Sequence, residues 1–216
     1  MFRLDLLQFV YLAVALLCSL SVHEFSHAWM ADRLGDPTAR YMGRLTLNPL
    51  AHLDPYGTLF MLLAIASGIG IGWAKPVPFN PNNLRGSYRT GIGLVSAAGP
   101  ASNLLLAVAA AILARLTDVL PLPIAIPTLF AYFVVVNVSL MLFNLIPFPP
   151  LDGAKVLVGI LGRFRGRWAY DLGNQVMDLE RYGIMPLFVL LIVNSFIPIL
   201  TGPLGFISGI IINVLL

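Results

Sequence analysis

The chain of 216 residues contains little charge and a single cysteine. Asp, Glu, Lys and Arg make up 11% of it, whereas about 25% is usual for a soluble globular domain. So few charges cannot give the chain a polar surface, and its 58% of hydrophobic residues predict a protein embedded in a lipid bilayer. The single cysteine, Cys18, excludes an internal disulfide bond and any multi-cysteine metal site. The formal net charge of +3 is small, and we expect no nucleic-acid partner.

Long apolar segments predict an all-α fold, a polytopic bundle of membrane helices. About 20 apolar residues are needed to cross the hydrocarbon core of a bilayer. Four segments come near or exceed that length: residues 4–31, 91–116, 125–146 and 184–200. The apolar tail 203–216 is short, and whether it spans the membrane stays open.

Two segments do not fit complete spans. Residues 57–73 form an apolar run of 17 residues with three glycines near its end, so we predict a re-entrant or interfacial element there. A short membrane-associated β segment in the 40–80 region would fit as well. Residues 152–182 are mixed in composition and predict a surface helix, whose basic cluster at 163–167 would face lipid headgroups.

The basic residues predict how the chain is oriented in the cell membrane. Eleven of the thirteen Lys and Arg residues fall within three segments, 32–56, 75–89 and 153–182. Because cytoplasmic loops are enriched in Lys and Arg, we expect these segments on the cytoplasmic side and the N-terminus on the extracytoplasmic side of a multi-pass protein. Basic residues flank the run 57–73 on both sides, which agrees with an element that enters the membrane without crossing it.

The first long apolar segment contains His23-Glu24-Phe25-Ser26-His27, an H-E-x-x-H motif. Residues four apart lie on one face of an α-helix, so both imidazoles can bind one metal ion, while Glu24 can reach a metal-activated water and act as a general base. The alternative is a chance group of polar residues on a helix surface. A charge at the centre of a membrane span costs about 2.5–3.5 kcal/mol, so three ionisable residues within five need a shared role. The motif therefore predicts Zn²⁺ bound by His23 and His27, with Glu24 as the catalytic base.

A zinc site of this type needs a third protein ligand and leaves a fourth position for water. The only other histidine in the chain is His52. The stretch 144–153 offers Asp152 instead, because prolines break a spanning helix there, and broken backbone at membrane depth is tolerated only in protein or beside a wet cavity. Asp152 could alternatively cap a helix over 153–162. Beside an H-E-x-x-H motif without its third ligand, we favour Asp152 as the ligand.

Taken together, these stretches resemble the site-2 protease family of intramembrane zinc metalloproteases. The resemblance covers about residues 15–160 and is carried by the H-E-x-x-H motif and three further stretches: Gly72-Trp73-Ala74-Lys75-Pro76-Val77-Pro78-Phe79, Ala98-Gly99-Pro100-Ala101-Ser102-Asn103 and 144–153. It implies one Zn²⁺ ion held by His23, His27 and Asp152, with Glu24 as base.

The resemblance also implies a function and a domain organisation. We expect a metalloendopeptidase that cleaves membrane-protein substrates in or near their transmembrane segments, in regulated intramembrane proteolysis. Its substrates would include membrane-tethered regulatory proteins already trimmed by another protease. Residues 1–216 would form a single intramembrane protease domain, with a catalytic core at about 4–160 and C-terminal membrane helices at about 183–216. This matches compact bacterial members without PDZ-like or nucleotide-binding appendages.

Several assignments stay open at this stage. The family suggests that Asn144 positions the substrate or the catalytic centre, but a buried Asn that bridges helices is equally plausible. For His52 and Asp54, a contact behind the metal ligands or an aid to transition-state charge competes with a polar loop at the membrane surface, which we prefer. The roles of His52 and Asn103 and the oligomeric state stay unknown.

Two rival functions remain. A transporter or channel with His and Asp along a metal path would need no base, so Glu24→Gln should leave its activity largely intact. An inactive relative that serves as a membrane binding module is not favoured, because the base and all three expected ligands are present.

Overall fold

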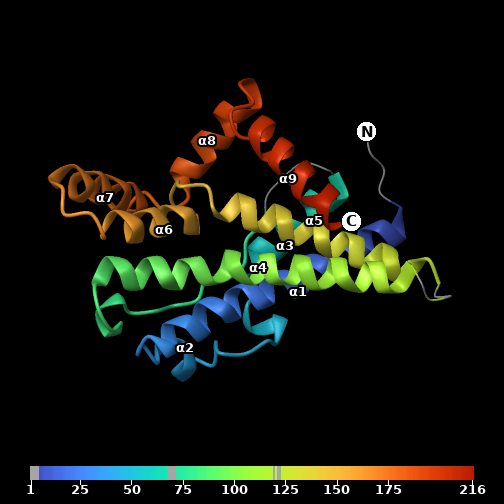
Figure 1. Cartoon of the computed structure of the whole chain (residues 1–216), viewed down its shortest axis with the longest axis horizontal. Helices are drawn as coiled ribbons and strands as arrows, with labels where there is room; N and C mark the ends of the chain where they lie inside the picture. Colours follow the sequence, from blue (N-terminus) through green and yellow to red (C-terminus); the bar gives the residue numbers. More distant parts are fainter. Residues whose placement is uncertain (1–4, 68–71, 119, 121–122) are drawn as a thin grey trace.

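The computed structural model describes residues 5–67, 72–118, 120 and 123–216 of the chain. This described part is all-α, as predicted, and its β pairing is limited to an isolated antiparallel bridge between Leu53 and Ala74. Three helices are long and apolar enough to cross a membrane: α1 (Leu6–Arg33), α4 (Tyr88–Asp118) and α5 (Ala125–Asn144). They pack against one another and form the centre of a multi-pass membrane protein (Figure 1).

Small side chains allow these helices to approach closely. Ala107, Ala110 and Ala111 of α4 pack with Val134 and Val138 of α5 in one buried cluster. Lipid tails are as apolar as the helix surfaces, so membrane helices associate through close packing of such small residues. Helices α4 and α5 therefore form a closely packed pair at the centre of the bundle.

Local sequence signals explain several helix ends. The Asp5 carboxylate accepts the Gln8 backbone N–H at 2.7 Å, and the Gln8 side chain accepts the Asp5 N–H at 3.2 Å, which forms a capping box before α1. Helix α5 ends at Asn144, shortly before Pro147, which has no N–H to continue a helix. Helix α3 (Pro55–Ser67) begins with a proline, which suits the first turn of a helix.

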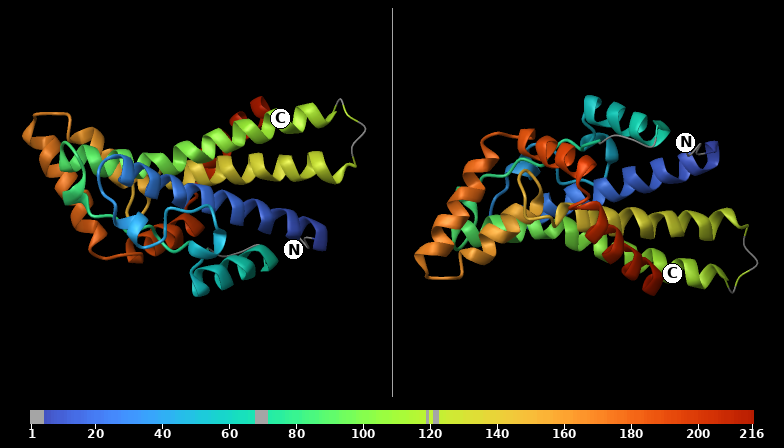
Figure 2. Two further views of the ribbon diagram at one scale, coloured as in Figure 1. Left: turned by 90° about the horizontal axis from the view of Figure 1, so that it is seen from below. Right: turned by 90° about the horizontal axis from the view of Figure 1, so that it is seen from above.

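One end of each of the three long helices lies close to the predicted site. The C-terminal ends of α1 and α5 and the N-terminal end of α4 gather at one end of the bundle, beside α6 (Asp152–Leu161) and α7 (Arg167–Glu180) (Figures 1 and 2). The single surface helix expected over 152–182 was wrong, because two helices occupy this segment. Gly162 and Gly166 bracket the break between them, and glycine disfavours a continuous helix.

Helix α6 crosses α4 at a pair of glycines. A Cβ added to Gly93 would lie 2.8 Å from the Cα of Gly159, and the reverse holds as well. The two backbones are therefore in direct contact. This contact holds α6, whose first residue is Asp152, against the N-terminal half of α4, and Ser96 of α4 lines the same cavity as Asp152.

The C-terminal region differs from the expected span over 184–200. Helix α8 (Met185–Phe196) has 12 residues, a length of about 18 Å, which is short of the roughly 30 Å hydrocarbon core. Helix α9 (Thr201–Leu215) follows at an angle of 88°. The Asn194 side chain accepts the N–H groups of Leu200 and Thr201 at 2.7 Å and 3.3 Å, which stabilises the bend. The pair could be a broken span or a re-entrant loop by length and composition.

The described part of helix α3 is also too short to span the membrane. Its 13 residues extend about 20 Å, and it packs against α1. Its length agrees with the prediction of an element that does not cross, although its membrane position stays a prediction. Two of the three glycines singled out in this run lie at 68 and 70, outside the described residues. Short turns of helix complete the fold: α2 (Thr38–Tyr41), η1 (Pro49–Ala51) and η2 (Pro81–Asn83).

Candidate metal centre

Two histidines of α1 and one aspartate of α6 converge between the long helices. His23 Nε2 lies 3.0 Å from His27 Nε2, and Asp152 Oδ2 lies 3.1 Å and 3.2 Å from these two nitrogens. Both histidines are buried. Within the described part of the chain, this is the one group of three His, Cys, Asp or Glu residues whose ligand atoms lie within 4.8 Å of one another. The structure thus brings together the three residues that the sequence analysis assigned to a metal.

The backbone around Asp152 directs its carboxylate toward the histidines. Asp152 is the first residue of α6, and Leu151 occupies the N-cap position. A Cβ at Gly153 would lie 2.3 Å from the carbonyl oxygen of Leu145, so only glycine lets α6 start this close to the end of α5. Because Asp152 lies inside the helix and no side-chain hydrogen bond caps α6, the structure disfavours the alternative in which Asp152 serves as the helix cap.

A hydrogen bond to α4 determines which nitrogen of His27 faces the centre. His27 Nδ1 lies 2.8 Å from the carbonyl oxygen of Val95. A carbonyl can only accept, so Nδ1 donates, and Nε2 of the neutral ring presents its lone pair to the centre. Pro100, inside α4, cannot donate to the carbonyl of Ser96, which weakens the helical hydrogen bonding in the turn next to Val95.

A chain of buried polar groups orients His23 in the same way. The carbonyl of Phe133 and the hydroxyl of Ser19 each lie 2.8 Å from Asn137 Nδ2. Because the carbonyl cannot donate, Asn137 turns its Oδ1 toward Asn103, whose Nδ2 donates to it at 2.8 Å. Asn103 then presents its Oδ1 to His23 Nδ1 at 2.6 Å, so that nitrogen donates. The amide orientations therefore leave His23 Nε2 free as a ligand.

The resulting site fits a zinc ion. Three lone-pair-bearing atoms face one point, at separations of 3.0, 3.1 and 3.2 Å. Ligands about 2.0–2.1 Å from zinc at tetrahedral angles lie about 3.3 Å apart. Acceptors this close repel one another unless a cation or protons lie between them. Gly99 adds the necessary space, because a Cβ there would lie 2.5 Å from His27 Nε2 and 2.6 Å from His23 Nε2.

Glu24 lies beside this triangle without belonging to it. Its Oε2 accepts the backbone N–H of Val77 at 3.1 Å. It faces a cavity of about 360 Å³ that His23, His27 and Asp152 also line. Glu24 is partly exposed, so its carboxylate is accessible from this cavity.

Hydrogen bonds hold the segment 72–80, which follows α3, in position along this cavity. The Lys75 N–H donates to the carbonyl of His52 at 2.8 Å, and the buried Arg44 guanidinium donates to the carbonyl of Lys75 at 2.5 Å. Farther along, the Asn80 N–H donates to Asp36 Oδ2 at 2.6 Å. These contacts fix the backbone next to His23, Glu24 and His27.

Asp36 is fully buried at the turn after α1. Desolvation raises the pKa of its carboxyl, but hydrogen bonds from the side chains of Thr38 and Asn83 and from the N–H groups of Asn80 and Thr38 outweigh it. The pKa of Asp36 is therefore held below its ordinary value. A carboxylate that stays ionised keeps this anchor intact at neutral pH.

The remaining candidates have different positions. Asn144 lines the cavity and donates its side-chain N–H to the carbonyl of Leu140 at 3.0 Å. His52 is 1% exposed and packs within its own loop, where its Nε2 lies 2.7 Å from the carbonyl oxygen of Thr46. It lies outside the metal triangle and organises the loop that supports Lys75.

Asp54 has a local structural contact. Its Oδ1 accepts the N–H of Gly57 at 2.7 Å, which caps the first turn of α3. The sequence analysis missed Asn137 and Ser19 and left Asn103 open. An available signal was the presence of amide side chains inside apolar spans, which usually bind across helices.

The fold and the site together define an integral membrane metalloprotease. Residues 120–187 match the family model described as Peptidase family M50. The chain is 36% identical over 188 residues to "Putative zinc metalloprotease YwhC" of Bacillus subtilis, an alignment that covers 84% of this chain and 80% of the relative. It is 35% identical over 151 residues to "Putative zinc metalloprotease Rip2" of Mycolicibacterium smegmatis, covering 69% and 56%. The Mycobacterium tuberculosis protein of that name matches over 153 residues with the same coverage.

The family follows from these matches. The chain belongs to peptidase family M50, the site-2 protease family, and it is a zinc metalloprotease. No solved structure matches the chain.

Proposed function

We propose that the protein is an intramembrane endopeptidase that hydrolyses peptide bonds in or near transmembrane segments of membrane proteins. The observation that carries the proposal is the position of two of the three candidate metal ligands, His23 and His27, within a long apolar helix. His27 and His23 precede Arg33, the last residue of α1, by six and ten residues, or about 9 Å and 15 Å along the helix axis. Catalytic groups at this depth would act on a peptide bond within the membrane.

Each polar residue of the site has a distinct role in this proposal. His23, His27 and Asp152 would hold the ion, and the bound ion would supply Lewis acidity to the scissile carbonyl and the attacking water. Glu24 would take the proton from the water and deliver it to the leaving amine. Asn103 and Val95 would hold the two imidazoles with Nε2 toward the centre.

The substrate must be unwound before attack, because a helix hides its carbonyls in backbone hydrogen bonds. The segment 72–80, which is not helical and lies beside the cavity, would hold the substrate by strand addition. Asn144 would help to position that strand, since it lines the same cavity. Substrates would include membrane-tethered regulatory proteins already trimmed by another protease, and residues 1–216 would act as one protease domain in regulated intramembrane proteolysis.

The orientation in the membrane is part of the proposal. The N-terminus would lie outside the cytoplasm, and the metal centre would lie toward the cytoplasmic face. The clustering of the site-bearing helix ends at one end of the bundle supports a single aqueous entrance (Figure 2). A cytoplasmic position of this end is supported by the basic residues of segments 32–56, 75–89 and 153–182.

Comparative proteomics of membrane fragments tests the function. Cells would carry the wild-type protein, Glu24→Gln, or Asp171→Asn, a matched carboxylate-to-amide change at an exposed position of α7. Fragments of single-span proteins should accumulate with the wild type and Asp171→Asn and be absent with Glu24→Gln. The same fragments in Glu24→Gln cells would contradict a protease that uses this base and would favour the metal-transport alternative.

A further inference from the structure

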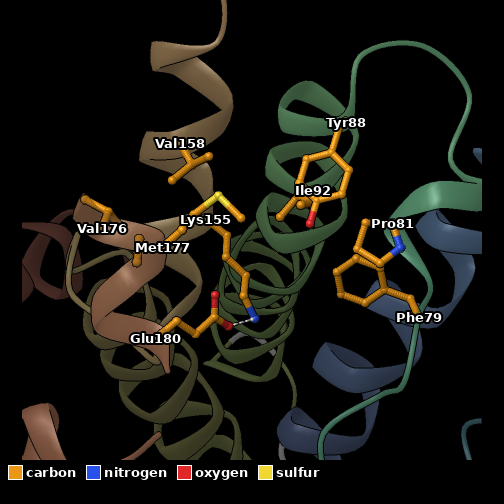
Figure 3. A pocket seen from close by; sticks show the side chains of 10 residues that line it. Phe79, Pro81, Tyr88, Ile92, Lys155, Val158, Val176, Met177 and Glu180 are labelled. Carbon is orange, nitrogen blue, oxygen red and sulfur yellow. Dashed lines mark ion pairs between the residues drawn. The ribbon is translucent and has the colours of Figure 1, made fainter. Parts of the chain in front are cut away.

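A second cavity adjoins the catalytic cavity. It has a volume of about 230 Å³ and lies between the start of α4, α6, α7 and the chain before η2 (Figure 3). Its walls combine apolar side chains with the polar side chains of Tyr88, Lys155 and Glu180. The apolar side chains come from separate elements: Phe79, Ile92 of α4, Val158 of α6, and Val176 and Met177 of α7.

The two cavities share wall residues. Phe79 and Lys155 line both of them. Lys155 follows Asp152 by three residues on α6, a distance of about 4.5 Å along the helix axis. A peptide in the catalytic cavity would therefore pass directly by the entrance to the second cavity.

The volume of the second cavity indicates what it can hold. Pockets for complete small-molecule ligands usually measure about 300–1,000 Å³. The second cavity, at about 230 Å³, is smaller than this range and adjoins the catalytic cavity of about 360 Å³. This combination suits one side chain of a longer ligand whose backbone lies at the metal.

The charges indicate an apolar side chain. Lys155 Nζ lies 2.9 Å from Glu180 Oε1, so the lysine charge is already paired (Figure 3). A free ammonium would attract an acidic side chain, whereas this pair leaves the apolar walls as the recognition surface. A further charge beside this pair would find both ionic partners already taken.

The wall formed by α7 is held in place by α4. Arg89 donates to Asn174 Oδ1 at 2.7 Å and to the carbonyl of Tyr170 at 3.3 Å, and its guanidinium lies 4.5 Å from the centre of the Tyr170 ring. A wall fixed in this way can discriminate between side chains by size, because it does not have to be ordered when the substrate binds.

We propose that the second cavity is a specificity subsite that receives one large apolar side chain of the substrate, of leucine, methionine or phenylalanine size, next to the cleaved bond. The inference rests on the proposed function and adds a side-chain preference to it. Truncation of that side chain should slow cleavage, because a hydrophobic pocket discriminates by about 10–200-fold for each methylene group.

A reporter series tests the subsite with the full-length protein in lipid vesicles. Each reporter has one span of about 20 alternating alanine and valine residues, in which one position after another carries phenylalanine or alanine. The wild type should prefer phenylalanine over alanine by about 10-fold or more in initial rate at one fixed position relative to the cleaved bond. Val176→Trp, which fills the cavity, should cleave the alanine reporter and lose that preference. Leu172→Trp places the same side chain on the exposed face of α7 and should keep it.

Met177→Ala provides a second variant that does not depend on tolerance of a tryptophan. It enlarges the cavity and should shift the preferred side chain from phenylalanine to tryptophan. An unchanged preference in an active Val176→Trp or Met177→Ala protein would overturn the subsite while leaving the proposed function intact. Absence of Glu24-dependent cleavage from every reporter would overturn the proposed function itself.

Discussion

The amide of Asn137 acts on the metal centre from a distance, through Asn103. Asn137→Leu removes the acceptor that orients the Asn103 amide, so Asn103 can turn its nitrogen toward His23. The proton of His23 would then move to Nε2, the ligand nitrogen. We expect zinc affinity to fall by about 10–100-fold, the usual effect of losing such a supporting contact. Competition with a chelator measures the affinity, and ¹⁵N NMR of labelled histidine reports the tautomer.

The control for this change is Asn213→Leu, an exposed asparagine of α9. It should leave both zinc affinity and the histidine tautomer unchanged. If Asn137→Leu also leaves both unchanged, the hydrogen-bond chain has only a packing role.

Gly99 provides a steric test of the same centre. Gly99→Ala would place a methyl group 2.5 Å from His27 Nε2, and the space for the ion would be lost. Zinc content after purification should drop severely, while Gly209→Ala, whose Cβ meets nothing within 4 Å, should retain zinc. Metal analysis of the two proteins decides the point, and a fully loaded Gly99→Ala protein would exclude the proposed ion position.

Substitutions of Glu24 and Asp152 should have different effects on zinc binding and proteolysis. Glu24→Gln removes the proposed base but no ligand, so zinc should stay bound while proteolysis is lost. Asp152→Ala removes a proposed ligand, so zinc affinity should fall as well. The comparison requires metal content and cleavage rate for each purified variant. Full zinc occupancy with retained activity in Asp152→Ala would return Asp152 to the role of a helix terminus.

At the scale of elements, the turn after α1 and the segment 72–80 are joined through Asp36. The pKa of Asp36 is lowered in the folded protein, so its contribution to stability is complete above the unfolded pKa of about 3.9 and is lost as the pH falls through the folded pKa. Asp36→Asn should lower the midpoint of thermal unfolding at pH 7. The difference from the wild type should stay constant down to about pH 5 and shrink below about pH 4.

Thermal unfolding in detergent at several pH values measures this difference. Asp171→Asn removes an exposed carboxylate of α7 and should show little difference at any pH. A difference between wild type and Asp36→Asn that grows on acidification would contradict the assigned anchor.

The elements show why sequence patterns predicted some features and not others. The four-residue spacing of His23 and His27 is local, so the helix period alone places them on one face. Asp152 was predictable because prolines mark a broken helix beside it. The contact of Asn137 with Ser19 joins residues 118 positions apart, and no local period indicates such a pairing. The bend between α8 and α9 depends on a side chain, Asn194, which composition alone does not single out.

At the scale of the whole molecule, the arrangement of helix ends predicts which segments share an aqueous side. Segments before and after α3 should lie on the same side, because α1 ends and α4 begins at one end of the bundle (Figure 2). In a Cys18→Ser background, cysteines at Asn48 and Asn82, both exposed, should react with a membrane-impermeant reagent from the cytoplasm. A cysteine at the exposed Leu120 should react only from outside. Labelling of Asn48 and Asn82 from opposite sides would make α3 a true span.

The convergence of three lone pairs at the junction of α1, α4 and α6 affects how much of the protein accumulates in the cell. A group of acceptors that repel one another without a cation makes metal binding part of the folding free energy. An ion at 100 times its dissociation constant stabilises the folded state by about 2.7 kcal/mol, and a change of about 1–2 kcal/mol alters cellular abundance several-fold. The supply of zinc would therefore set how many copies of this protease survive quality control, in addition to how many are active.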